Sequence, residues 1–349
     1  MNEYEFDIVI IGGGCIGSSI AFHLAQKGFR HFAIVDSGRK NLSATSQSGG
    51  LLRVFHENTD HVDLALRHHE LKKTLQTQNI LLETNTPNGS LYFFDRRRFN
   101  DYTLNLHKME AAGYPFEIVT AKTGATRFPM FAWNADSWAV YEPLGNHASA
   151  NQFCDDLLDY SQHSGLTMID NFEVERICFF RDRYRLFNRA HSVFAKTLIF
   201  AGGARSIPHL HELGIGHSLK AQELKVYKSK ESLSTLNISN AAENSAIPNF
   251  FDREKLQYSG VVGQQRLIVS DLSLEKLNHC FDPERFQEIW ALDCYAPQRL
   301  GYAGFLAGHP RLLLATGWGG TAFKFSLEIG HRIAQALENK PIERSIAHA

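Results

Sequence analysis

The chain has 349 residues, of which 44% are hydrophobic and 21% are charged, a balance typical of a soluble globular protein. Lys plus Arg number 36 and Asp plus Glu number 37, so the formal net charge of -1 argues against a large electrostatic commitment to nucleic acid or to an anionic membrane. The chain is longer than one that forms a single hydrophobic core of ordinary size, so two domains are predicted.

The five cysteines are scattered along the chain without a CxxC pair, which favours a reducing compartment over a disulfide framework or a zinc cage. The 17 histidines lack the spacing of a zinc helix, so no metal site is expected. The acidic start of the chain lacks the basic region of a signal peptide, and no apolar run is long enough to span a bilayer. These features predict a cytoplasmic protein without a transmembrane helix.

The beginning of the chain has the pattern of a β-strand, an α-helix and a second β-strand. Residues 7–11 are β-branched and almost wholly apolar, as in a buried strand. Residues 18–27 follow as a helix that ends at Gly28, because glycine commonly stops helices. Residues 31–35 form the next apolar strand, which Asp36 closes.

The rest of the chain gives a coarser pattern. Helices are predicted over residues 62–78, 104–112, 150–164 and 326–337. Apolar strands are predicted over residues 197–201 and 312–316, and an alternating strand over residues 89–94. Loops and short strands are expected from residue 115 to 143. Alternating runs between residues 220 and 300 predict an antiparallel sheet in a second domain.

A glycine-rich turn, Gly12-x-Gly14-x-x-Gly17, joins the first strand to its helix. The first glycine permits a tight turn, the second lets the backbone approach a pyrophosphate, and the third lets helix and strand pack closely. The helix N-terminus offers free N–H groups and a partial positive charge to the phosphates. Asp36 stands where an acid binds the ribose hydroxyls and disfavours a 2′-phosphate. The unit therefore predicts dinucleotide binding.

The segments after this unit favour FAD over NAD. A nicotinamide dehydrogenase usually continues directly with further strand–helix units, whereas residues 42–50 here are small and polar. The later apolar strands end in glycine clusters at residues 202–203 and 317–320. Glycine lets the backbone lie against a flat ring, a phosphate or a ribityl chain. This spread along the chain favours a long dinucleotide with a large ring at one end.

With these features the chain resembles the D-amino-acid oxidase superfamily of FAD enzymes, and within it the monomeric sarcosine oxidase and N-methyltryptophan oxidase branch. The resemblance covers nearly the full length. It rests on Asp36 and on residues 10–17, 46–53, 64–67, 200–206 and 317–324. The segment Gly-Trp-Gly-Gly-Thr-Ala-Phe-Lys-Phe, which starts at residue 317, is much more specific to this branch than the glycine turn.

The resemblance implies an α/β fold, in which a Rossmann-like FAD-binding domain of the glutathione-reductase type is interleaved with an antiparallel-sheet substrate domain. The FAD-binding domain would use residues 1–86, 145–212 and 303–349, and the substrate domain would use residues 87–144 and 213–302. The residues expected to hold FAD are Gly12, Gly14, Cys15, Ile16, Gly17, Asp36, Ser37, Ser46, Gln47, Gly49, Val174, Ala201, Gly202, Gly203, Cys294, Gly317, Gly319, Gly320, Thr321, Phe323 and Lys324.

Two cations, Lys324 and Arg53, are candidates for holding the substrate. Lys324 stands just before the last predicted helix, where a cation opposes the helix dipole and so suggests an anionic partner. Arg53 lies among apolar residues, so a partly buried guanidinium there needs a partner. In the family, a lysine matching Lys324 helps to hold the substrate carboxylate near the flavin. A family arginine matching Arg53 pairs with that carboxylate or with the flavin region.

In the sarcosine oxidase branch, a cysteine in a Cys-x-Tyr-Thr context carries the flavin through a thioether to its 8-methyl carbon. Here the context is Cys294-Tyr295-Ala296-Pro297, with the tyrosine one place early. Two interpretations of Cys294 therefore stay open: a covalent flavin link and a small core residue.

The oxidases of the family place a lysine of the substrate domain over the flavin to activate dioxygen. Arg266 is the best match to that position here. An arginine spreads its charge and does not titrate, which argues against fast oxidase turnover. Further candidates for the substrate pocket are Tyr258, Tyr295, Gln298 and Arg299.

The favoured function is oxidation of the C–N bond of a small amine or (N-methyl) amino acid by hydride transfer to FAD. Three alternatives stay open: a dehydrogenase with an acceptor other than oxygen, a tailoring enzyme that modifies a partner protein or a biosynthetic intermediate, and an FAD-binding scaffold subunit. Lys324 and Arg53 argue against the scaffold, because a scaffold needs no substrate cations. The expected partner is a small-molecule amine, and a protein partner is left open.

Overall fold

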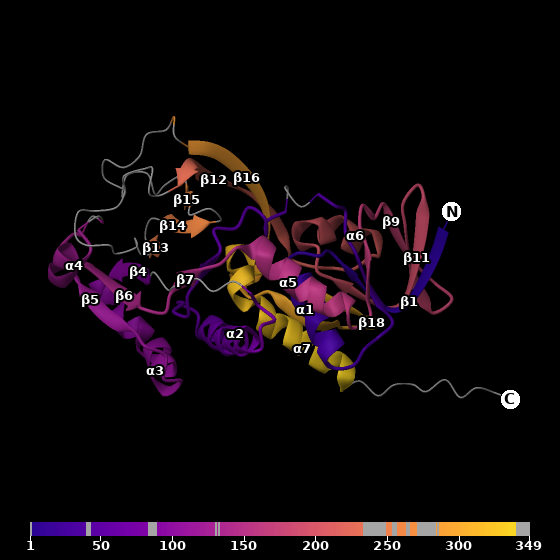
Figure 1. Cartoon of the computed structure of the whole chain (residues 1–349), viewed down its shortest axis with the longest axis horizontal. Helices are drawn as coiled ribbons and strands as arrows, with labels where there is room; N and C mark the ends of the chain where they lie inside the picture. The colour runs from indigo at the N-terminus through magenta and orange to yellow at the C-terminus, as the bar shows by residue number, and fades with distance from the viewer. Residues whose placement is uncertain are drawn as a thin grey trace.

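The computed structural model describes residues 2–39, 43–82, 89–129, 131, 133–232, 249–252, 257–262, 266–270, 284 and 286–339. The described strands form two 8-stranded sheets and one pair of short strands, β3 (Leu51–Leu52) and β7 (Asn146–His147). Figure 1 shows the two larger sheets in different halves of the molecule, with the long strands β12 and β16 reaching from one half towards the other.

The first sheet has a parallel centre. Its main order is β17-β18-β11-β1-β2-β8, and β10 and β9 extend it as a hairpin on β11. The parallel strands are β1 (Asn2–Ile11), β2 (Phe32–Val35), β8 (Leu166–Ile169), β11 (His191–Phe200) and β18 (His309–Thr316). The antiparallel strands are β9 (Arg176–Phe180), β10 (Arg183–Phe187) and β17 (Tyr302–Leu306).

The central strand of this sheet is covered on both faces. In β1, Ile8 and Ile10 belong to one hydrophobic core, and Val9 and Ile11 belong to a second. The first core also contains apolar side chains of α1 (Cys15–Gln26), α5 (Ala150–Gln162) and α7 (Ser326–Glu338). Figure 1 shows these three helices side by side. A strand covered on both faces needs apolar residues at successive positions, which is the pattern that predicted it.

The second sheet has the order β16-β12-β15-β14-β13-β4-β6-β5. All its neighbours are antiparallel except β13 and β4. Its strands are β4 (Ser90–Asp95), β5 (Glu117–Thr120), β6 (Ser137–Glu142), β12 (Lys220–Ser232), β13 (Asn249–Asp252), β14 (Gln257–Val262), β15 (Arg266–Ser270) and β16 (Phe286–Tyr295). The expected α/β fold class with a separate antiparallel sheet is confirmed. The boundaries of the two expected domains stay a prediction.

The remaining helices differ in how well the sequence predicted them. There are four of them in the described residues: α2 (Thr59–Thr77), α3 (Thr103–Ala111), α4 (Ala121–Arg127) and α6 (Ser206–Glu212). The helix α4 lies where loops and short strands were expected. α4 begins with a capping box in which Thr120 and Thr123 bond to each other's backbone N–H. Apolar periodicity does not predict this helix, because the helix is short and Gly124 is its one buried residue. The capping box is the local signal that marks its start.

None of the helices in the described ranges combines the length and the apolar character that crossing a membrane requires. The cysteines that the structure describes, Cys15, Cys154, Cys178 and Cys294, are all free thiols.

The contact between α1 and α7 depends on a glycine. A Cβ added to Gly330 would lie 2.5 Å from the carbonyl carbon and oxygen of Ser19, which are backbone atoms of α1. We therefore expect Gly330→Ala to lower the free energy of unfolding by about 1–3 kcal/mol through overpacking, although alanine favours a helix by about 1 kcal/mol. Urea unfolding measures the change. Gly216→Ala is the matched control, because nothing lies within 4 Å of its added Cβ. Equal stability of the two variants would contradict the expectation.

Candidate functional site

A cavity of about 610 Å³ lies where β1, β11 and β18 end. All three glycine clusters of the sequence reach it, through Gly12, Gly14, Gly202, Gly203 and Gly317. Open parallel sheets bind ligands at the carboxyl ends of their strands, because loops and helix N-termini converge there. Segments that are far apart in the sequence therefore line one cavity.

Backbone contacts explain the glycines at the start of this site. Gly12 has a φ of +99°, and a Cβ on it would lie 2.9 Å from the Cα of Gly202. A Cβ on Gly17 would overlap the carbonyl oxygen of Gly12. The first glycine thus lets two loops touch, and the third lets α1 start directly against β1, as the motif requires.

Asp36 lies at one end of the cavity. Its Oδ2 accepts a hydrogen bond of 2.7 Å from the backbone N–H of Gly13, and its Oδ1 accepts one of 2.8 Å from Gly38. Nearby, Arg205 donates to the hydroxyl of Ser37, the residue after Asp36, at 3.4 Å. These bonds fix the carboxylate at the cavity wall, where a ribose can bind.

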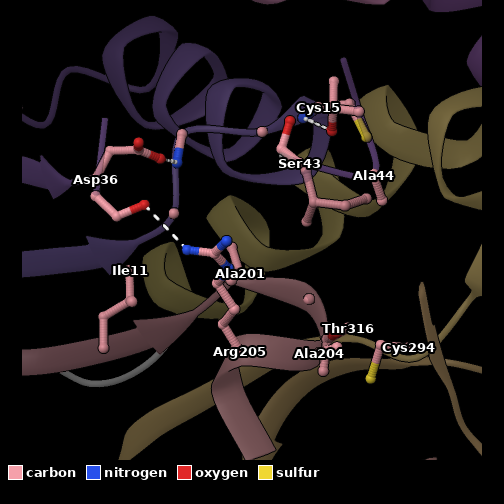
Figure 2. Close-up of a pocket in the computed structure, with 18 of the residues that line it drawn as sticks. Ile11, Cys15, Asp36, Ser43, Ala44, Ala201, Ala204, Arg205, Cys294 and Thr316 are labelled. Carbon is pink, nitrogen blue, oxygen red and sulfur yellow. Dashed lines mark hydrogen bonds between the residues drawn. The ribbon is translucent and has the colours of Figure 1, made fainter. Parts of the chain in front are cut away.

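The other end of the cavity is formed by β16 and the end of β18. Asp293 and Cys294 reach it from β16, and Thr316 reaches it from β18. Figure 2 shows Cys294 and Thr316 on the side of the view opposite to Asp36, and Cys15 at the start of α1. The lining of the cavity therefore includes Asp36 on one side and Asp293 of β16 on another.

The structure brings together thirteen of the residues expected to hold FAD. Those that line the cavity are Gly12, Gly14, Cys15, Ile16, Asp36, Ser37, Val174, Ala201, Gly202, Gly203, Cys294, Gly317 and Gly319. Those that do not line it are Gly17, Ser46, Gln47, Gly49, Gly320, Thr321, Phe323 and Lys324. In this second group, Phe323 packs in the core against Phe153, with ring centroids 5.1 Å apart. The hydroxyl of Thr321 donates to the carbonyl of Trp318 at 2.6 Å.

Lys324 is buried rather than exposed at the start of a helix. It lies in the 3₁₀ helix η7 (Gly319–Phe325), and its residue is 6% exposed. Within the described residues, its ammonium makes one hydrogen bond, of 3.3 Å, to the carbonyl oxygen of Gly320. Burial, together with the positive charge of Arg53, lowers the pKa of Lys324 to about 7, and Asp293 opposes this shift.

Arg53 is also buried, at 7% exposure, directly after β3. Its guanidinium donates to the carbonyl oxygen of Phe55 and lies 4.8 Å from the centre of the Tyr92 ring. Burial lowers the pKa of Arg53, and the nearby Tyr92 and Glu142 oppose that shift. The sequence argument that a buried arginine at this position needs partners therefore agrees with the contacts that surround it.

Glu142, at the end of β6, holds the backbone beside Arg53. It is fully buried, and its carboxylate accepts from the N–H groups of Val54 at 2.6 Å and of Phe55 at 3.1 Å. Burial raises the pKa of Glu142, and these amide hydrogen bonds and Arg53 oppose the shift. Glu142 of β6 thus holds the segment that carries Arg53, and this segment directly follows β3.

Two histidines complete the surroundings of the cations. His56 and His61 contact each other and the ring of Phe325, with centroid distances of 5.6, 5.1 and 5.0 Å. Within the described part of the chain, the buried Nε2 of His56 has no hydrogen-bond partner. Burial and the charges of Arg53 and Lys324 lower the pKa of His56 well below its usual value, so this ring is neutral. Neither histidine stands in a motif that predicts a functional role.

The other predicted substrate residues have different placements. The ring of Tyr295 packs against Gly319, and Arg299 lies over it at 5.6 Å. Gln298 and Arg299 are exposed and have positive φ angles of 55° and 59°. Tyr258 and Arg266 are on β14 and β15, but their side chains lie outside the described part of the chain. Their expected roles therefore stay predictions.

Sequence reasoning missed Glu142 and Asp293. Neither stands in a glycine motif, and both belong to strands of the second sheet. The available signal was weak: each is an acid at or near the end of an otherwise apolar or alternating strand. Their proximity to Arg53 and Lys324 is a consequence of the tertiary structure.

The pKa of Lys324 gives a testable dependence of stability on pH. The pKa of a lysine in the unfolded state is ~10.4, whereas the pKa of Lys324 in the folded state is about 7. Between these two pH values, the unfolded state therefore binds more protons than the folded state. Stability of the ligand-free protein therefore rises with pH across this window, by at most about 1.4 kcal/mol per pH unit. We expect Lys324→Met to be more stable than the wild type at pH 7 and to lose this advantage by pH 10. Urea unfolding at several pH values measures the difference, with the exposed Lys122→Met as control. Parallel pH curves for Lys324→Met and the wild type would contradict the assignment.

Comparisons with known proteins agree with this geometry. The sequence profile of a family described as FAD dependent oxidoreductase (DAO) matches residues 7–336. A monomeric sarcosine oxidase of Streptomyces avermitilis is 23% identical over 259 residues, which is 73% of this chain and 65% of that protein. The chain therefore matches just under two thirds of that relative's length.

Two solved structures share the fold. A glycine oxidase from Geobacillus kaustophilus has a TM-score of 0.77 at 20% identity, covering 99% of this chain and 97% of that one. An L-proline dehydrogenase from P. horikoshii has a TM-score of 0.80 at 14% identity, covering 97% and 94%. The family match, which spans most of the sequence, confirms the resemblance inferred from the motifs: the chain belongs to the DAO family of FAD dependent oxidoreductases, and this membership implies FAD as its cofactor.

Proposed function

We propose that the protein oxidises the C–N bond of a small amine or (N-methyl) amino acid that carries a carboxylate. The observation that carries this proposal is the buried ammonium of Lys324 close to the guanidinium of Arg53. A buried ammonium with one long hydrogen bond has donors left for a ligand. A carboxylate is an anion that pairs with an ammonium, and a guanidinium can bind it with two parallel hydrogen bonds.

The cavity fits the cofactor that the family implies. Gly12, Gly14 and the N–H groups at the start of α1 would hold the diphosphate, and Asp36 would bind the ribose of the adenosine half. The flavin half would then extend towards Gly317 and Gly319. When bound, FAD supplies the acceptor for a hydride from the carbon next to the amine nitrogen.

The residues of the chain orient the substrate in this proposal. Arg53 and Lys324 hold its carboxylate, and Glu142 keeps the Arg53 segment in place through two amide hydrogen bonds. Fixing the carboxylate fixes the neighbouring carbon, and such orientation is a large part of enzymatic rate enhancement. A substrate amine that binds neutral needs no general base, and the neutral ring of His56 adds no charge that would repel it.

The names of the relatives support this substrate class, since they include a sarcosine oxidase and a glycine oxidase. We further propose that the segments predicted from the sequence, residues 1–86, 145–212 and 303–349 for FAD and 87–144 and 213–302 for the substrate, are the two domains. Free thiols at Cys15, Cys154, Cys178 and Cys294 support a reducing compartment, and we propose the cytoplasm.

A dehydrogenase is the second candidate. A rat protein named dimethylglycine dehydrogenase is 40% identical over 50 residues, although these are 14% of this chain and 6% of that protein. Arg266, the best match to the lysine that the family's oxidases use, also supports an electron acceptor other than oxygen, because an arginine does not titrate. Both candidates share the oxidation of the substrate and differ only in how the reduced cofactor is reoxidised. Modification of a partner protein stays an alternative outcome of the substrate test.

We propose that FAD is held without a bond to Cys294. Burial raises the pKa of this thiol more than its hydrogen bond with Thr316 lowers it, and Asp293 adds to the increase. The thiolate is the nucleophilic form of cysteine, so these surroundings disfavour attack on a flavin. Cys294 also belongs to the hydrophobic core on the β9–β10 side of the parallel sheet.

The substrate proposal predicts reduction of the bound flavin. Anaerobic mixing with a panel of N-methyl, cyclic and α-amino acids should bleach the visible flavin absorbance with at least one of them. Arg53→Met should weaken binding of that substrate about 10–100-fold, the value of a hydrogen bond to a charged group. Stopped-flow absorbance gives the rate and the apparent Kd.

Two controls make this test specific. Arg67→Met removes an exposed arginine that pairs with Glu70, and it should leave the apparent Kd unchanged. The analogue of the substrate without its carboxylate should bind Arg53→Met and the wild type equally. Flavin that stays oxidised with the whole panel would overturn the proposal, and so would an Arg53→Met variant with wild-type affinity.

The non-covalent proposal predicts where the yellow colour goes after precipitation with acid. Flavin should remain in the supernatant of both the wild type and Cys294→Ala, because no bond ties it to the polypeptide. A yellow pellet from the wild type and a colourless one from Cys294→Ala would show the thioether link instead.

A further inference from the structure

Asp293 is a buried carboxylate that the proposed reaction does not use. It lies on β16 next to the edge of the cofactor cavity and is 9% exposed. Its carboxylate makes one hydrogen bond within the described residues, accepting from the hydroxyl of Tyr295 at the long distance of 3.4 Å. A buried carboxylate normally has several donors, so this one has acceptor positions left for a ligand.

The alternation of β16 separates Asp293 from Cys294. Successive side chains of a strand point to opposite faces, so Asp293 and Tyr295 share one face and Cys294 has the other. Tyr295 packs on Gly319, and a Cβ on Gly320 would lie 3.8 Å from Oδ2 of Asp293. The face of β16 that meets Gly319 and Gly320 therefore carries the carboxylate, and Cys294 packs in a hydrophobic core.

The charge of Asp293 affects the pKa values of two residues near the cavity, Cys15 and Lys324. Cys15 begins α1, where the diphosphate would bind, and Lys324 marks the substrate end. Burial raises the pKa of Cys15 to about 11, and the charge of Asp293 contributes to this increase. The same charge opposes the lowering of the Lys324 pKa by burial. The charge of Asp293 thus acts on both residues, and Asp293 lines the same cavity as Cys15, Gly317 and Gly319.

The chemistry of FAD determines which part can meet a carboxylate there. The diphosphate is an anion and would repel Asp293. Between the diphosphate and the flavin ring lies the ribityl chain, whose hydroxyl groups are hydrogen-bond donors. A carboxylate would serve the same purpose at the adenosine end, where Asp36 lines the cavity and would accept from the ribose hydroxyls.

We infer that Asp293 accepts hydrogen bonds from the ribityl hydroxyls of bound FAD and thereby contributes to the affinity and placement of the cofactor. This inference rests on the FAD-binding part of the proposed function. It does not depend on the substrate, because the contact forms in the protein–FAD complex alone.

The test is a titration of FAD-stripped protein with FAD, followed by quenching of flavin fluorescence in the absence of substrate. Asp293→Asn should raise the Kd for FAD about tenfold, because it replaces charge-assisted hydrogen bonds with weaker neutral ones. Asp293→Leu, which removes every acceptor, should raise it further. Asp101→Asn is the matched control, since it removes the same charge from an exposed side chain of η2 (Arg96–Tyr102).

FAD analogues that lack one ribityl hydroxyl identify the contact. For the wild type, the Kd of at least one analogue should be about tenfold higher than the Kd of FAD. For Asp293→Asn, the Kd of that analogue and the Kd of FAD should be equal, because the contact is already lost. Without FAD, Asp293→Asn should unfold at the same or a higher urea concentration than the wild type, because it removes a poorly paired buried charge. A purely structural acid would lower that midpoint.

Three results would overturn the inference. They are an unchanged Kd for FAD in Asp293→Asn, equal losses for every analogue in both proteins, and a lower urea midpoint for the FAD-free variant. Each can occur while amine oxidation stands. Conversely, a protein that oxidises none of the amines can still show the expected loss of FAD affinity, so the two proposals fail separately.

Discussion

The contact between the backbones of Gly12 and Gly202 is the constraint on which the site depends. It brings the loop after β1 against the loop after β11, and a single Cβ at Gly12 would lie 2.9 Å from the neighbouring Cα. Because β1 and β11 are parallel partners, both loops leave the sheet at the same edge. The cavity forms at this edge, and β18 brings the third glycine cluster to it.

Four buried charged groups influence one another near this cavity, and of these four Asp293 alone is among its lining residues. Lys324 and Arg53 are cations without full solvation, and Glu142 and Asp293 are acids that lie close enough to influence the pKa of Lys324. These groups belong to four different elements or loops, so the fold compensates each charge with groups from elsewhere in the chain. A carboxylate substrate would complete this balance near Lys324, and a hydroxyl-bearing cofactor would complete it near Asp293.

Several features were predictable because their causes are local. The apolar run of β1, the glycine turn and the stop at Gly28, which has a φ of +85°, are all readable from neighbouring residues. The ends of elements were less predictable. β1 extends back to Asn2 because its first residues pair with His191–Phe194 of β11, and such pairing is invisible in the residues of β1 alone. The capping box of α4 was a readable signal that apolar periodicity did not detect.

The sequence by itself determined the dinucleotide unit, the family resemblance and the two cations, because each depends on a short motif with a fixed physical requirement. The tertiary structure decided which groups surround those cations. Glu142, His56 and Asp293 come close to Arg53 or Lys324 only through sheet pairing and loop packing, and no spacing along the chain encodes that proximity. It also decided that Lys324 is buried, because the exposure of a residue before a helix depends on what packs over it.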